Sequence, residues 1–344
     1  MKLEGLEISR DAGVLTLAIA NPPLNVLTQT VRASLGDLWE AVQQDRGVRS
    51  VLWRSGERAF CAGADLKEFS ARFDPQVARA HGLNAHRMIR GLVDIDVPVI
   101  ACIRGFCMGG GLELALGCSY RIAARTASLA LPEVRRGVWP GTGGTLLLAR
   151  AVGPSRAKEL LCTGRTLTAT EALQLGVVDQ VVDDDELDLR GDALATEIAR
   201  QPGPSLRTMM ALVDRGFRSE FREHLEFELE RFVQAYQLPE AREGQAAFFE
   251  RRAPRWAHAG SAAGLFAQER RRLVQRHRVD RLEAEIDEAL LRRGLVDHLG
   301  DGLVEACRDL RPDALGRQDH RPGVGLEPRE ARLGERRHVG QQGR

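Results

Sequence analysis

Apolar and polar positions alternate near the start of the chain, and the pattern then changes to helical spacing. Residues 6–20 carry a turn at 11–13 between two apolar or alternating runs, which predicts a β-hairpin. Between residues 28 and 44 the apolar positions recur at helical spacing, at Val31, Leu35, Leu38 and Val42. The run VRSVLWRS at 48–55 is then typical of a buried strand. A helix between two strands predicts a crossover with parallel strand pairing.

Strands and helices continue to alternate as far as about residue 153, and helices alone follow. Strands are predicted at 98–105, 120–124 and 128–133, and glycine-rich segments at 109–111 and 140–145 each lead into a helix. Further helices are predicted at 154–162, 168–175, 188–200, 204–217, 219–237 and 241–250. The pattern therefore predicts an α/β core with crossovers and a helical C-terminal segment.

Composition narrows the class of protein. Of the 344 residues, 43% are hydrophobic and 28% are charged, as in soluble globular proteins. No apolar run reaches the roughly 18 residues of a membrane span, and the first residues lack a signal-peptide core, so we expect a cytoplasmic protein without a membrane partner. The 6 cysteines form no C-x-x-C pair, which predicts no zinc site. A net charge of +1 argues against a nucleic-acid partner.

Residues 258–344 differ in composition from the rest of the chain. They contain 17 arginines and 15 acidic residues but no lysine, threonine or asparagine. One helix is predicted within 268–293, and disorder is predicted beyond Pro312. The near balance of charge disfavours RNA binding. Two other interpretations of residues 258–344 are an oligomerisation or targeting appendage and a segment read in an altered frame.

Two glycine-containing segments follow predicted strands and expose backbone amides. They are AFCAGADL at 59–66 and GFCMGGGLEL at 105–114. Small side chains leave the N–H groups unshielded, and in the second segment these groups also begin a helix, which favours negative charge. Two such amides directed at one point form an oxyanion hole. Each loop alone is more typical of a tight turn or a phosphate-binding loop, although no dinucleotide or nucleotide triphosphate motif is present.

Two glutamates lie beside these segments in apolar sequence. Glu113 stands between Leu112 and Leu114, and Glu133 follows the run LALP. Burial raises the pKa of a glutamate, which then transfers protons near neutral pH. On the residues alone, it is equally plausible that Glu113 interacts with a helix dipole and that Glu133 ends a strand.

Three motifs in this order and spacing resemble the enoyl-CoA hydratase/isomerase, or crotonase, superfamily. They are FCAGADLK at 60–67, GFCMGGGLELALGC at 105–118 and LPEVRRGVWPGTGGT at 131–145. The similarity extends through 163–182 and 241–254, and covers roughly residues 3–257. It implies an α/β fold, the ClpP/crotonase-like spiral of ββα repeats, with two nearly perpendicular sheets and a C-terminal helical segment.

The resemblance also implies a division of the chain and an assembly. Residues 1–195 would form the spiral core with the active site. Residues 196–257 would form a helical oligomerisation segment, and 258–344 an arginine-rich tail. The family's usual assembly implies a homotrimer or homohexamer.

Five residues take catalytic roles by this resemblance. The backbone amides of Ala62 and Gly110 would bind the thioester oxygen and stabilise the enolate. Glu113 and Glu133 would hold and activate water and exchange a proton with C2 of the acyl group, and the amide of Gly141 would help to hold that water. Which glutamate is the acid stays open.

The substrate would contact the residues around these groups. The expected binding residues are Leu24, Ala62, Gly63, Ala64, Asp65, Leu66, Lys67, Gly110 and Trp139. Lys67 and Arg251 or Arg252 are candidates for contact with CoA phosphates. Trp139 would either line and shorten the acyl pocket or pack in the core. His81 and His86 are expected to be exposed helix residues, and Cys61 a small buried hydrophobic residue.

The presence of both glutamates favours hydration within this superfamily. The implied activity is a hydro-lyase of fatty acid β-oxidation that converts a 2-enoyl-CoA to a 3-hydroxyacyl-CoA. It would need no metal or redox cofactor, with coenzyme A entering only as part of the acyl-CoA substrate. An enoyl-CoA isomerase or another acyl-CoA lyase is the alternative, and a non-catalytic RNA-binding or scaffold protein is the alternative from another class. The acyl group stays open.

Overall fold

Two β-sheets form the framework of residues 3–256, the part of the chain that the computed structural model describes. The predicted helix within 268–293 and the predicted disorder beyond Pro312 lie outside these residues. The larger sheet has the order β1 (Leu6–Asp11), β2 (Val14–Ile19), β3 (Ser50–Arg54), β5 (Val99–Ile103), β7 (Tyr120–Ala124) and β10 (Gln180–Val182). The smaller sheet has the order β4 (Ala59–Cys61), β6 (Phe106–Met108), β8 (Ser128–Ala130) and β9 (Leu167–Thr168).

Strand pairing confirms the predicted hairpin and crossovers. β1 and β2 pair antiparallel, whereas β2, β3, β5, β7 and β10 pair parallel in sequence order. In the smaller sheet β4, β6 and β8 are parallel, and β9 is antiparallel to β8. The short strands β4, β6, β9 and β10 were not predicted as separate elements, because each has only two or three residues and shows no period of its own.

The helices of the described residues follow the predicted segments within a few residues, except the helix at 75–93, for which no bounds were predicted. They are α1 (Gln29–Gln44), α2 (Pro75–Val93), α3 (Gly110–Gly117), α4 (Gly144–Val152), α5 (Pro154–Thr163), α6 (Ala169–Leu175), α7 (Leu187–Ala199), α8 (Gly203–Gly216), α9 (Phe221–Ala235) and α10 (Pro239–Phe249). Three short 3₁₀ helices are η1 (Leu66–Glu68), η2 (Ser70–Phe73) and η3 (Glu133–Arg136). Side-chain caps explain several starts: Thr28 accepts from the Val31 amide, and Asp74 precedes Pro75 and caps α2.

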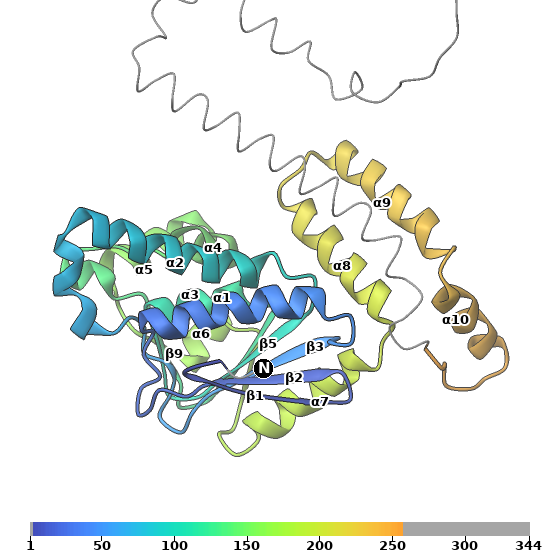
Figure 1. The fold of residues 1–344 in the computed structure, drawn as a ribbon, viewed down its shortest axis with the longest axis horizontal. Coiled ribbons are helices and arrows are strands. Elements are labelled where there is room, and N and C mark those ends of the chain that lie inside the picture. Colours follow the sequence, from blue (N-terminus) through green and yellow to red (C-terminus); the bar gives the residue numbers. More distant parts are fainter. Residues whose placement is uncertain (1–2, 257–344) are drawn as a thin grey trace, which may run out of the picture. The chain divides into compact units, whose positions relative to one another are not determined.

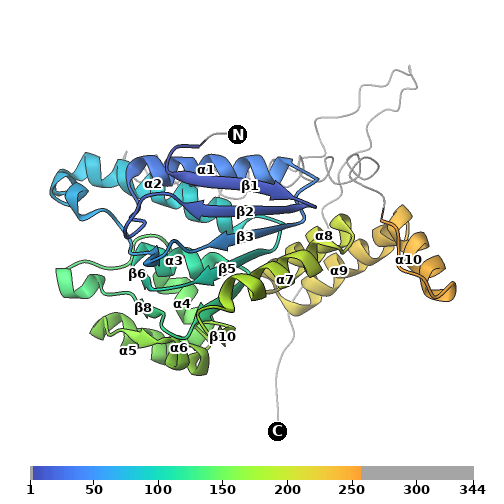
Figure 2. The same cartoon turned by 90° about the horizontal axis from the view of Figure 1, so that it is seen from below.

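The central strands β3 and β5 of the larger sheet are buried on both faces, as expected for parallel strands, whereas the edge strand β1 is mostly exposed. Alternate residues of β3 point to opposite faces, so that Trp53 packs in the main core and Leu52 packs in a smaller one. Figure 1 shows α1 and α2 over one face and α7 across the other. Helix α7 packs on β2, β3, β5 and β7. The smaller core therefore lies between the sheet and α7, and Figure 2 shows the same arrangement from below.

Glycines allow α3 to begin very close to β4. A Cβ atom added to Gly111 would lie 2.0 Å from the carbonyl oxygen of Cys61, a distance that no side chain can adopt. Gly109, the N-cap of α3, has a φ of 53°, in the left-handed region that favours glycine. The GGG triplet therefore brings the N-terminus of α3 beside the loop that follows β4.

Helix α8 is fastened to the core by one buried arginine. Arg207 is 7% exposed, pairs with Asp96 and donates to the carbonyl oxygens of Asp45 and Val48. The apolar residues of α8, α9 and α10 are, in contrast, largely exposed, namely Met209, Val213, Phe217, Phe221, Leu225, Leu229, Phe232, Val233, Tyr236, Phe248 and Phe249. The helical segment therefore presents an unusually large apolar surface.

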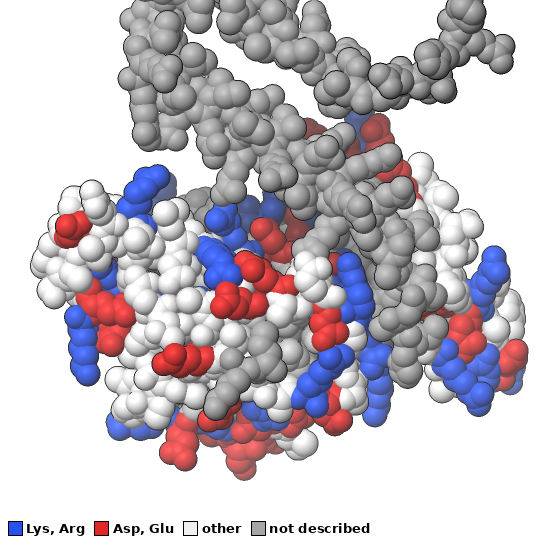
Figure 3. All heavy atoms as spheres, in the orientation of Figure 1, with Lys and Arg blue, Asp and Glu red and all other residues white. Residues whose placement is uncertain are grey.

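Charged side chains of both signs are interspersed on the face that Figure 3 shows. This distribution offers no continuous basic surface there for a polyanion. Within residues 3–256, no helix has the length and apolar character that crossing a membrane requires.

Candidate active site

The loop after β4 carries one backbone amide that is already paired and one that is not. Ala62 N–H donates to the Leu24 carbonyl at 3.0 Å, so this amide is not available to a thioester oxygen. The expectation for Ala62 is therefore wrong in this structure. Leu27 forms a parallel β-bridge with Ala64: the Leu27 N–H donates to the Gly63 carbonyl, and the Leu27 carbonyl accepts from the Asp65 N–H. In such a bridge the N–H of Ala64 points away from Leu27. Among the described residues no acceptor lies on the Ala64 N–H.

The amide of Gly110 lies beside this loop. Gly110 is the first residue of α3, a position at which the N–H group has no acceptor within the helix. A Cβ atom added to Gly63 would lie only 3.4 Å from Gly110 N, which shows how closely the two segments approach. The positive end of the helix dipole adds to the attraction for negative charge. Gly110, as predicted, and Ala64 therefore supply the neighbouring unpaired amides.

Glu113 is buried and held by a loop from outside its own helix. It is 2% exposed, and its Oε1 accepts hydrogen bonds from the amides of Thr142 and Gly144 at 2.7 and 2.8 Å. Burial raises the pKa of Glu113, whereas these two hydrogen bonds and the nearby His86 oppose the rise. The PGTGGT loop therefore fixes the carboxylate of Glu113, a contact that was not predicted from the sequence.

Glu133 carries a buried oxygen without a partner. It begins η3 after β8, and its Oε2 has no hydrogen-bond partner among the described residues. Burial, with a further contribution from the charge of Glu113, raises the pKa of Glu133 to about 7. A buried carboxyl oxygen without a partner is costly for stability and is typical of a functional site.

Both carboxylates flank the start of α3. A Cβ atom added to Gly109 would lie 2.6 Å from Glu133 Oε1, and one added to Gly110 would lie 3.9 Å from Glu113 Oε2. Two acid–base groups therefore lie next to the amide of Gly110. This arrangement allows a proton to leave one bound group and enter another while negative charge collects near the amides.

The remaining predicted residues vary in exposure. Asp65 caps η1 by accepting from the Lys67 amide at 2.9 Å, and Leu66 is 58% exposed. Trp139 is 76% exposed, so the alternative that it packs in the core is wrong. Arg252 forms ion pairs with Glu243 and Glu250. Leu24 is half-buried, and its carbonyl is the group that accepts from Ala62.

The two histidines of α2 differ. His81 is buried, contrary to expectation, and its Nδ1 lies 2.9 Å from the Gln29 side-chain nitrogen. Burial and nearby arginines lower its pKa to about 4, so His81 is a neutral structural residue. His86 is exposed as expected, but its Nε2 lies 2.9 Å from the carbonyl oxygen of Gly141.

Cys61 and the other cysteines of residues 3–256 give no sign of catalysis. Cys61 is fully buried, and burial raises the pKa of its thiol to about 12, which suppresses the thiolate. Cys102, Cys107 and Cys118 are also buried as free thiols, and Cys162 is exposed. In residues 3–256 no group of three histidine, cysteine or carboxylate side chains has the spacing of a metal site.

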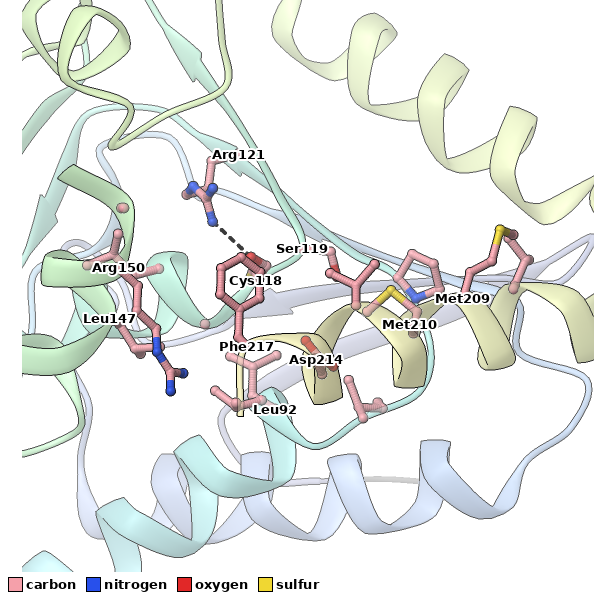
Figure 4. A pocket seen from close by; sticks show the side chains of 18 of the residues that line it. Leu92, Cys118, Ser119, Arg121, Leu147, Arg150, Met209, Met210, Asp214 and Phe217 are labelled. Atoms are coloured by element: carbon pink, nitrogen blue, oxygen red, sulfur yellow. Dashed lines mark hydrogen bonds between the residues drawn. The ribbon is translucent and has the colours of Figure 1, made fainter. Parts of the chain in front are cut away.

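A cavity of about 530 Å³ lies at the opposite end of α3 from the glutamates. Figure 4 shows Leu92, Cys118, Met210 and Phe217 on its wall, with Arg121 donating to the Cys118 carbonyl. Neither Glu113 nor Glu133 lines this cavity. It belongs to the junction between α8 and the core.

Comparisons with known proteins agree with the motifs. A sequence model described as enoyl-CoA hydratase/isomerase matches residues 9–259. A "probable enoyl-CoA hydratase" of Bacillus subtilis is 34% identical over 255 residues, which is 74% of this chain and 99% of the relative. A "crotonyl-CoA hydratase" of Syntrophomonas wolfei is 33% identical over 254 residues, 73% of this chain and 97% of the relative. The crystal structure of an enoyl-CoA hydratase from Bacillus anthracis superposes with a TM-score of 0.72 at 31% identity, over 74% of this chain and 100% of that one.

Proposed function

We propose that this chain, which belongs to the enoyl-CoA hydratase/isomerase family, adds water to a 2-enoyl-CoA to give a 3-hydroxyacyl-CoA. One observation carries the proposal: the buried carboxylate of Glu113 and the half-buried one of Glu133 flank the first residues of α3, beside two unpaired amides. Many isomerases of the family resemble this pattern with only the second carboxylate. The pair at Glu113 and Glu133 therefore favours hydration over isomerisation.

The amides would stabilise the charge that develops on the thioester. Attack of water at C3 moves an electron pair through C2 to the carbonyl oxygen and forms an enolate. The N–H groups of Ala64 and Gly110 would donate to this oxygen, in a site where the donors are already fixed. Ala64 takes the role for which the motif suggested Ala62, because the Ala62 amide is engaged with Leu24.

The glutamates would divide the proton transfers. Hydrogen bonds from Thr142 and Gly144 favour the ionised form of Glu113, which suits a base that takes a proton from water. Glu133, with a pKa raised to about 7, suits an acid that donates to C2. Coenzyme A enters as part of the substrate, and the proposed steps need no metal or redox cofactor.

Turnover of crotonyl-CoA tests the proposal directly. Hydration removes the conjugated double bond, so the absorbance of the thioester should fall when purified protein is added. Crotonyl-CoA is the first choice because one relative is named as a crotonyl-CoA hydratase. Absence of turnover with crotonyl-CoA and with longer, branched and cyclic 2-enoyl-CoAs would overturn the proposal in favour of isomerisation or other enolate chemistry.

The pH dependence should follow from the shared proton of the glutamate pair. The pKa of Glu133 is raised to about 7 by burial and by Glu113, so the singly protonated pair loses its proton above this pH. We expect kcat/KM to fall about tenfold per unit above about pH 7. The dehydration reaction should show the same limb, because hydration consumes no net proton and the ratio of the two constants is the equilibrium constant. A flat profile from about pH 6 to 9 would contradict the assignment of Glu133.

We also propose a homotrimer or homohexamer in which residues 196–257 form contacts between subunits. The exposed apolar residues of α8–α10 support this assembly, since monomeric proteins rarely expose so large an apolar surface. Sedimentation should give a mass of about three or six times 37.9 kDa. Replacing Phe217, which is 74% exposed, with aspartate should lower that mass, and a monomeric wild type would contradict the proposal.

A further inference from the structure

One peptide group connects His86 to Glu113. The carbonyl oxygen of Gly141 lies 2.9 Å from His86 Nε2, and the next N–H, that of Thr142, donates to Glu113 Oε1 at 2.7 Å. These two atoms belong to the same peptide bond, which is planar. The imidazole of α2 and the carboxylate of α3 therefore bind opposite ends of a single rigid unit.

Gly141 itself gives this peptide no side-chain support. Gly141 is exposed, and a Cβ atom added to it would meet nothing within 4 Å. Within the loop, Pro140 and Gly144 are buried and the Gly144 amide also donates to Glu113, whereas Gly141 and Thr145 are exposed. Rotation of the peptide would turn the Thr142 N–H away from Glu113. Hydrogen bonds at both ends therefore fix its orientation and also polarise it, which strengthens each bond.

We propose that His86 is a positioning residue for Glu113 and acts through the Gly141–Thr142 peptide. The inference rests on the proposed function, since it gives a role to the base of that reaction. Nε2 must carry a proton to donate to the Gly141 oxygen, and both the neutral tautomer and the imidazolium provide it. His86 thus holds the peptide in either charge state and adds a positive charge near Glu113 when protonated. The other charged group coupled to Glu113 is Glu133 of η3.

Two variants separate the hydrogen bond from the bulk of the side chain. His86→Leu removes the donor, and we expect kcat to fall about tenfold with KM within about twofold, the size of one lost hydrogen bond. His86→Gln keeps a donor of similar reach and should retain kcat within about threefold of wild type. Arg79→Leu, an exposed position on the same helix, is the control and should behave as wild type.

A titration of Glu113 reports directly on the hydrogen bond that it accepts from the Thr142 amide, which activity alone does not do. The carboxyl carbon of Glu113 can be followed by NMR in ¹³C-glutamate-labelled protein, with Glu113→Gln identifying its signal. The titration midpoint of Glu113 should rise in His86→Leu and rise less in His86→Gln, because the polarised peptide favours the ionised carboxylate.

The outcomes distinguish this inference from the proposed function. An unchanged kcat or an unchanged Glu113 midpoint in His86→Leu would overturn the role of His86. Equal losses in the Leu and Gln variants, with equal losses of melting temperature, would also overturn it. A wild type inactive on every enoyl-CoA would instead overturn the proposed function, and the titration would still report on His86.

Discussion

Replacing either glutamate by glutamine is expected to lower kcat for crotonyl-CoA hydration by about 10³-fold, within the range of general acid–base catalysis. The glutamine oxygen in Glu113→Gln can still accept from the amides of Thr142 and Gly144, so the loop should keep its conformation. The loss would then report proton transfer and not misfolding. Assays of thioester absorbance measure kcat, and melting temperatures show whether each variant is folded.

A double variant sharpens this prediction. Because both glutamates act on one water and one acyl group in the proposed reaction, the Glu113→Gln/Glu133→Gln protein should lose little more activity than each single variant. Glu7→Gln changes an exposed glutamate of β1 and serves as the control. A variant at either position that retains more than about one tenth of wild-type kcat would remove that residue from the mechanism.

The second large effect is expected from Gly110→Pro. Proline is well tolerated at the first position of a helix, where the amide has no acceptor within the helix. The substitution therefore removes the N–H group that we assign to the oxyanion while it disturbs α3 little. We expect kcat to fall by about 10²- to 10³-fold, the usual effect of losing one oxyanion-hole donor.

Gly110→Ala is the matched control for the added side chain. Its Cβ atom would lie 3.0 Å from Leu27 Cδ1, so a small adjustment of that side chain is required in both variants. The alanine variant keeps its N–H and should retain most of the activity. Equal losses in the proline and alanine variants would show that crowding, and not the amide, explains the effect.

Much of the fold, and the pairing of Glu113 with Glu133, could be predicted from the sequence. The crotonase fold is confirmed by the solved relative with a TM-score of 0.72, and the helices from residue 154 onward lie within a few residues of their predicted bounds. Gly110, Glu113 and Glu133 lie together as the motifs implied. These features depend on local periodicity and on short motifs, which a single sequence contains.

The choice between Ala62 and Ala64 was not available from the motif. Both alanines flank Gly63, and their amides differ only in what they meet across space. The Leu24 carbonyl accepts from the Ala62 amide, and the bridge to Leu27 leaves the Ala64 amide pointing outward. Both leucines belong to a segment more than thirty residues earlier in the chain. Which of these two amides stays free is therefore decided by tertiary contacts.

The burial of His81 and the contact of His86 with Gly141 were not predicted, for a similar reason. Helical spacing does not reveal that Gln29 of α1 covers His81, or that the loop at Gly141 returns over His86. Hydrogen bonds between residues more than fifty positions apart determine the role of each. The divisions at residues 195 and 257 and the contacts with CoA stay predictions.

The anchoring of Glu113 by a distant loop has a consequence for refolding. Its two amide donors lie 29 and 31 residues further along the chain, and His86, which contacts the Gly141 carbonyl, lies 55 residues before Gly141. Helices form from local contacts, whereas these contacts also require the closure of long loops, which costs conformational entropy. After dilution from denaturant, turnover should therefore return no earlier than the far-UV circular dichroism, because the proposed base is held only when these distant contacts are in place.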